Sequence, residues 1–268
     1  MLNWNKRFSQ KEKIDISYTM TTLVVCLFIV VIKSLILPNS PEEIKENQTF
    51  LILNYAVFVF VVLVLLGMFF YHFFMCRYLN LDKKLRLVSL AVFFCALSEA
   101  IKIPLTIANV STVYAFIPFF LTHIFISIYS IKLAKFKKSE LLSALPFIIA
   151  AGVFIACFIL FYQPLPNEPK DALFMIEEVF ICVYIFLLFF TLWRVTITLV
   201  FEKQLLFFFL GYVLFFTSDL IVISSILIGD SQIITCFIWI TYLSANFLFS
   251  TCGTSSFTFN KFGLKGGV

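Results

Sequence analysis

Long apolar stretches separated by short polar breaks dominate the pattern of this chain. Eight such stretches are each close to the roughly 20 residues that an α-helix needs to cross a bilayer. The pattern therefore predicts an all-α, polytopic membrane bundle of eight transmembrane helices. The predicted spans are about Ser17–Leu37, Phe50–Phe74, Leu87–Pro104, Ser111–Leu133, Leu141–Tyr162, Ala172–Trp193, Gln204–Ile228 and Gln232–Cys252.

Composition agrees with this pattern and excludes a water-soluble globular domain. Hydrophobic residues make up 62% of the chain, charged residues only 13%, and the mean hydropathy is +1.03. No nucleic-acid-binding motif is present, so no nucleic-acid partner is expected. The 7 cysteines form no CxxC pair and lie mostly in apolar runs, which predicts buried free thiols rather than a metal site or a disulfide framework.

The distribution of positive charge predicts the topology. With the N-terminus inside, most of the 20 lysines and arginines fall on the inner side, including Arg194 and Lys203 after the sixth span. Both termini are therefore predicted to be cytoplasmic. Lys33 is expected to extend its ammonium from the end of the first span toward the interface. The predicted organisation is a cytoplasmic segment 1–16, a transmembrane domain 17–252 and a cytoplasmic tail 253–268.

Two carboxyl groups are predicted to lie inside the membrane at a similar depth. At 1.5 Å per residue, Glu99 lies ~18 Å and Asp219 ~21 Å from the inner ends of their spans. A buried Asp is costly in a bilayer and marks a functional site by default. Polar residues also recur at helical spacing on the last span, at Tyr242, Asn246 and Ser250, and these stripes should face the bundle interior.

Structural explanations compete with the functional one. Glu99 and Lys102, spaced i and i+3, could form an ion pair near the interface. His123 could be a hydrogen-bonding group between helices, and the polar stripe through Tyr242 could serve packing alone. Ser218-Asp219 is hardest to explain in this way, because no basic residue lies near it on its own helix.

The runs LGYVLFFTSDLIVISSILIG and ITYLSANFLFS resemble the last two helices of the lysoplasmalogenase (YhhN-like) membrane proteins, and VFFCALSEAIKIP with AFIPFFLTHIFISIYS resembles an earlier helix pair. Ser218 and Asp219 match the family's Ser-Asp motif, His123 its histidine and Tyr242 its tyrosine. Two positions depart from the pattern. Ser98-Glu99 stands where the family has Gly-Asp, and Ala245-Asn246 stands where it has Ala-Gln.

The resemblance implies hydrolysis of the vinyl ether of a lysoplasmalogen to a fatty aldehyde and a glycerophospho-alcohol. This reaction needs a carboxylic acid that protonates the β-carbon and a second carboxylate that guides water. Burial, and a second carboxylate nearby, both favour the protonated form of a carboxyl group. The expected catalytic pair is Glu99 and Asp219. The expected substrate-binding residues are His123, Ser218, Tyr242, Asn246 and Lys102, with no metal or other cofactor required.

Three functions are therefore compared. The first is an intramembrane hydrolase that acts on a lysophospholipid or another membrane lipid. The second is a non-catalytic lipid- or partner-binding bundle related to that family, motivated by the departures at Glu99 and Asn246. The third, weaker hypothesis is a proton-coupled carrier that uses Glu99, Asp219 and His123 as a relay. Each requires an integral, multi-pass location, which is the inner membrane in a bacterial cell.

Overall fold

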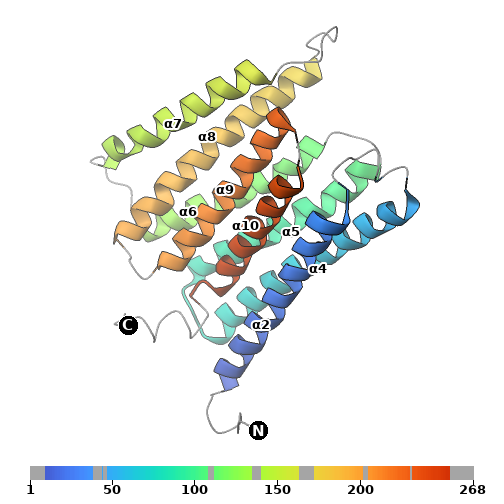
Figure 1. Cartoon of the computed structure of the whole chain (residues 1–268). Helices are drawn as coiled ribbons and strands as arrows, with labels where there is room; N and C mark the ends of the chain where they lie inside the picture. The colour runs from blue at the N-terminus through green and yellow to red at the C-terminus, as the bar shows by residue number, and fades with distance from the viewer. Residues whose placement is uncertain are drawn as a thin grey trace.

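The structure is a computed structural model in which the chain folds into a bundle of long helices (Figure 1). It describes residues 10–38, 44, 47–107, 112–134, 140–162, 172–201, 205–229 and 231–253. Within these ranges the chain is helical and has no strand. Eight of the helices found there are long and apolar enough to cross a membrane, as the sequence predicted. The protein is thus an integral, multi-pass membrane bundle.

Helices are the expected solution because the hydrocarbon core offers no partner for a backbone N–H or C=O group. The long helices are α2 (Gln10–Val31), α4 (Gln48–Tyr78), α5 (Arg86–Ile107), α6 (Phe116–Leu133), α7 (Leu141–Phe161), α8 (Ala172–Phe201), α9 (Leu206–Ile228) and α10 (Gln232–Thr251). Three short elements join or extend them, a π-helix η1 (Ile32–Ile36) and the 3-10 turns η2 (Lys83–Leu85) and η3 (Thr112–Ala115).

Several helices extend beyond the apolar stretch that revealed them. The first begins at Gln10 rather than Ser17, and α8 continues through Arg194 to Phe201. The predicted segment 1–16 is therefore partly helical. In contrast, the fourth span begins later than Ser111, since a 3-10 turn precedes Phe116. Pro118 is tolerated there because the N–H groups of a first helical turn have no partner within the helix.

Sequence neighbours pack together through most of the bundle. The pairs α9–α10, α4–α5, α5–α6 and α7–α8 lie in contact, and α6 also packs against α8. The first long helix, α2, packs against α4 and α10, so helices from the two ends of the chain lie in contact (Figure 1). Figure 1 also shows α7 at the edge of the bundle, beyond α8. Residues of α5, α6, α9 and α10 together line the polar cavity described below.

Two basic residues are placed differently from the sequence prediction. Arg194 does not follow the sixth span in a loop but lies inside α8 with its side chain fully buried. Its guanidinium donates to the carbonyl of Ala134 at 2.7 Å and to Glu140 at 3.4 Å, which ties the end of α6 and the start of α7 to α8. Lys33 does not extend to the interface, because the residue is buried and its ammonium donates to the amide oxygen of Asn54 at 2.6 Å.

Candidate functional site

Asp219 lies on the inward face of α9, where its carboxyl group is buried. Tyr184 of α8 donates its hydroxyl hydrogen to Oδ2 of Asp219 at 2.8 Å. His123 of α6 places Nε2 2.9 Å from the same oxygen. Both partners are fully buried, and Asp219 is only 4% exposed. Three helices thus converge on one carboxyl oxygen, so the cost of burying Asp219 is offset by hydrogen bonds from α6 and α8.

A second tyrosine contacts the other ring nitrogen of His123. The hydroxyl group of Tyr212 lies 3.0 Å from His123 Nδ1 and 3.0 Å from the carbonyl oxygen of Leu188, to which it donates. The two ring nitrogens of His123 thus contact Tyr212 on one side and Asp219 on the other. A proton on Nε2 or on the carboxyl group makes the 2.9 Å contact with Asp219 a hydrogen bond, so the pair can hold a transferable proton.

Glu99 supplies the second carboxyl group, from α5. Its Oε1 accepts from the ammonium of Lys102 at 2.8 Å, one turn further along the same helix. Its Oε2 is buried and has no hydrogen-bond partner among the described residues. The pairing expected from the i, i+3 spacing is therefore present. It does not saturate the carboxylate, because one oxygen remains available to a water molecule or a substrate atom.

Both carboxyl groups border the same cavity. Its volume is about 50 Å³, and its lining includes Glu99, Lys102, Ser218, Asp219 and Tyr242. The rest of the lining is apolar and aromatic, from Phe116, Phe119, Val222, Ile238 and Trp239. A cavity of about 10–15 Å³ can hold one water molecule. This cavity therefore has room for several waters but not for a lipid. The helix ends or side chains around it must move before a lipid can enter.

Most of the predicted site residues line this cavity, and two of them do not. Ser218 donates to the carbonyl of Ile238 at 3.3 Å, and Tyr242 donates to the carbonyl of Cys95 at 3.5 Å. Both border the cavity. His123 does not line it, and reaches it only through Asp219. Asn246 does not line it either, and its amide donates to the backbone oxygen of Tyr242 at 3.0 Å.

Tyr184 and Tyr212 are the residues that sequence reasoning did not place in the site. The signal was present, since Tyr212 lies seven residues before Asp219 and therefore on the same helix face. Tyr184 shares such a spacing only with Glu177, at the start of α8. Nothing in this spacing indicated that the faces of α8 and α9 meet at Asp219.

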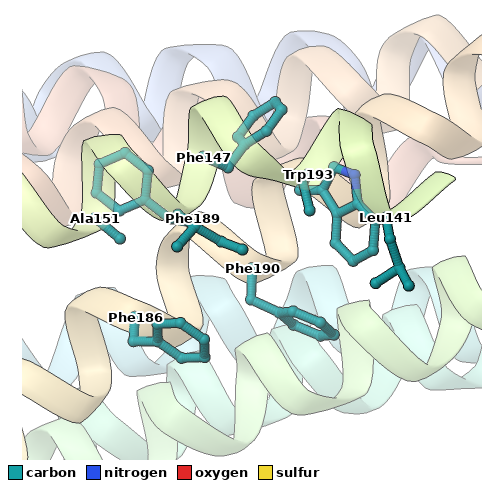
Figure 2. A pocket seen from close by; sticks show the side chains of 9 residues that line it. Leu141, Phe147, Ala151, Phe186, Phe189, Phe190 and Trp193 are labelled. Carbon is teal, nitrogen blue, oxygen red and sulfur yellow. The ribbon is translucent and has the colours of Figure 1, made fainter.

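A larger cavity lies elsewhere and lacks polar side chains for chemistry. It has a volume of about 270 Å³ between α7 and α8 and is lined by apolar residues such as Phe147, Phe186 and Phe190 (Figure 2). Figure 2 shows Trp193 at one end of it. The indole N–H of Trp193 donates to Ser143 at 3.0 Å. No carboxyl, histidine or thiol group lines this cavity, so the smaller polar cavity is the candidate site.

Within the described residues, fold and site together define a membrane protein with eight long apolar helices, four of which line a cavity that carries two carboxyl groups. The chain matches the YhhN family over residues 54–252, which is well over half of its length, and it belongs to that family. The matched region covers α5 to α10 and with them all residues of the candidate site. Comparison with curated proteins and with solved structures returned no match to the chain.

Proposed function

We propose that this protein hydrolyses the vinyl-ether bond of lysoplasmalogens. Lysoplasmalogenase activity is known in the YhhN family, to which the chain belongs. The single observation that carries the proposal is that the carboxyl groups of Glu99 and Asp219 border one cavity. A vinyl ether is cleaved by protonation of a carbon atom followed by addition of water, so two acid–base groups must reach the same substrate.

In this proposal the Asp219–His123 pair acts as the acid. The 2.9 Å contact between His123 and Asp219 can hold a transferable proton, and Asp219 presents this proton to the cavity. Transfer of that proton to the β-carbon of the vinyl ether converts the α-carbon and the ether oxygen into an oxocarbenium ion. Tyr184, which donates to the same carboxyl oxygen, stabilises the carboxylate that remains.

Glu99 acts as the base. Its carboxylate forms an ion pair with Lys102, and its second oxygen can accept a hydrogen bond from water. As this water adds to the α-carbon, Glu99 takes its proton and a hemiacetal forms. Glu99 then gives that proton to the departing glycerol oxygen, while the hemiacetal hydroxyl returns a proton to Asp219. The products are an aldehyde and a glycerophospho-alcohol, and both acid–base groups recover their starting states.

The remaining cavity residues would position the substrate. Ser218 and Tyr242 place hydroxyl groups at its wall, within reach of glycerol oxygens or of the attacking water. Asn246 would act indirectly, through the hydrogen bond that its amide donates to the backbone oxygen of Tyr242. The aromatic wall formed by Phe116, Phe119 and Trp239 limits access of bulk water, which strengthens the electrostatic interactions inside.

The test is to incubate the purified, detergent-solubilised protein with 1-alkenyl-glycerophosphoethanolamine and to measure the fatty aldehyde released. We expect aldehyde from the vinyl ether and none from the saturated 1-alkyl analogue. Asp219→Asn should lower the rate by roughly 10²–10⁴-fold, the usual contribution of a positioned acid or base. Asp82→Asn is the control, since Asp82 is an exposed residue in the turn before α5 and does not line the cavity.

Folding of each variant is checked by gel filtration and thermal unfolding. A folded wild-type protein that releases no aldehyde under any tested detergent or lipid condition removes the hydrolase assignment. If the same protein binds the lipid without turnover, a non-catalytic lipid-binding role replaces it.

A further inference from the structure

Lys33 is a buried basic residue that forms no salt bridge in the described part of the chain. It lies in the π-helix η1, a type of local widening that recurs at functional sites. Its ammonium donates to the amide oxygen of Asn54 at 2.6 Å and otherwise lies over aromatic rings, 3.6 Å from the centre of Phe58 and 5.6 Å from that of Trp239. An intramembrane charge that is satisfied only by neutral groups marks a functional position, because removing it from water is expensive.

Lys33 is connected to the candidate site by proximity. The centre of the Trp239 ring lies 5.6 Å from the Lys33 ammonium, and Trp239 also lines the cavity. Lys102 itself lines the cavity, and its side chain is 27% exposed. Lys33 of η1 thus lies close to a cavity that Lys102 of α5 borders directly.

Only one of the two lysines contacts a carboxylate. Lys102 forms a salt bridge with Glu99 at 2.8 Å, whereas Lys33 forms no salt bridge among the described residues. A negatively charged group of a ligand that reached Lys33 would therefore be its first charged contact. In a medium of low dielectric constant, such a contact favours an anionic ligand. The phosphodiester of a lysophospholipid head group carries one negative charge.

We propose that Lys33 and Lys102 together bind the phosphate of the lysolipid head group and so select phosphate-bearing lipids over neutral ether lipids. The inference rests on the proposed function for the identity of the lipid. It adds a phosphate subsite built in part by η1, a segment that lies before the residues matched to the family. In this arrangement the phosphate lies at the end of the cavity near the two lysines, and the vinyl ether extends toward Asp219 and Glu99.

The experiment measures binding with lipids that cannot be hydrolysed. The probes are 1-O-alkyl-glycerophosphoethanolamine and 1-O-alkylglycerol of equal chain length, titrated onto the full-length protein in detergent. We expect the phosphate-bearing lipid to bind roughly 10- to 100-fold more tightly, the range expected for one or two charge-assisted hydrogen bonds. Lys33→Met and Lys102→Met should each remove most of this preference, whereas Lys33→Arg should retain it.

A second variant keeps the test decisive if Lys33→Met does not fold. Asn54→Asp is close to isosteric and places a carboxylate 2.6 Å from the ammonium, where it would neutralise Lys33 without removing it. This variant should lose the preference for phosphate. Lys132→Met, at an exposed lysine in the last turn of α6, is the matched control and should change nothing. An unchanged preference in Asn54→Asp or Lys33→Met would overturn the proposal.

Two further measurements separate the possible sources of phosphate and the two hypotheses. Inorganic phosphate should compete only weakly, because it lacks the hydrocarbon chain. Competition as strong as that of the lipid would contradict a lipid head-group subsite. Aldehyde release without a preference for phosphate would leave the hydrolase standing and remove the subsite. A preference for phosphate in a protein that releases no aldehyde would support the phosphate subsite and remove the hydrolase assignment.

Discussion

Nε2 of His123 lies 2.9 Å from Oδ2 of Asp219, although the two residues are separated by 96 positions in the sequence. The contact links α6 to α9 in the centre of the bundle. Because Tyr212 holds the opposite ring nitrogen, the imidazole has one defined orientation toward Asp219. This relationship makes Asp219 part of a proton-holding pair rather than an isolated carboxylate, and the first prediction below depends on it.

Tyr212→Phe should lower turnover more than substrate binding. The substitution leaves Nδ1 of His123 and the carbonyl of Leu188 without the hydroxyl group that they contact, which costs about 1–3 kcal/mol in a buried position. We expect kcat for vinyl-ether hydrolysis to fall roughly tenfold or more, with little change in KM. Aldehyde release measured over a range of substrate concentrations separates the two parameters. Tyr78→Phe, at an exposed position, is the control. A rise in KM at constant kcat would show that Tyr212 acts on binding instead.

Glu99→Gln and Glu99→Asp should differ in activity. Glutamine removes the base and the ion pair with Lys102, so we expect a loss of roughly 10²-fold or more. Aspartate keeps the carboxylate but withdraws it by one methylene group from the 2.8 Å contact, so its activity should lie between those of the glutamine variant and the wild type. Aldehyde release under saturating substrate is the measurement. A glutamine variant as active as the wild type would exclude Glu99 as the base.

Arg194→Met should destabilise the bundle without directly changing the cavity. It leaves Glu140 buried without its cation and removes the donor to the carbonyl of Ala134, and breaking a buried pair in this way costs about 3–5 kcal/mol. The thermal unfolding midpoint in detergent should therefore fall. The double variant Arg194→Met, Glu140→Leu should recover part of the loss, because no uncompensated charge remains. A single variant as stable as the wild type would mean that this contact contributes little.

Gly211→Ala should destabilise the α9–α10 pair. A Cβ atom at Gly211 would lie 3.2 Å from Cβ of Leu248 and 3.2 Å from the buried ring of Phe249, and neither neighbour can retreat easily. Gly67→Ala is the matched control, since nothing lies within 4 Å of the added atom and alanine favours a helix by up to about 1 kcal/mol. The unfolding midpoint should fall for the first variant and stay constant or rise for the second. Equal unfolding midpoints for the two variants would show that α9 and α10 accommodate the added methyl group without loss of stability.

The sequence was sufficient to predict the helices and several of the residues around the site. Uninterrupted apolar length gives the number of spans, because a membrane helix must satisfy its own backbone within a core of nearly constant thickness. Rise per residue placed Glu99 and Asp219 at a similar depth, and both border the same cavity. The proposed cytoplasmic position of both termini stays a prediction from the distribution of charge.

The same reasoning was wrong about the side chain of Lys33 and about the end of the helix that carries Arg194. Both lie near the ends of apolar stretches, where a long basic side chain usually extends to the interface. In this protein Asn54 and the aromatic rings of α4 and α10 hold Lys33 inside, and Glu140 with the carbonyl of Ala134 holds Arg194 inside. These partners lie 20 or more positions away, and the local sequence gives no indication of them.

Sequence by itself determined the apolar part of each membrane helix and which of its residues share a face, because these depend only on the length of the apolar stretch and the period of an α-helix. Tertiary structure alone decided which faces meet. In the folded protein Tyr184 and His123 contact Asp219, and Tyr212 contacts His123. Asn246 contacts the backbone of Tyr242 and does not line the cavity. The reason is that helix packing in a membrane is set by close contact of side chains and by hydrogen bonds between helices, and neither is encoded in the periodicity of a single span.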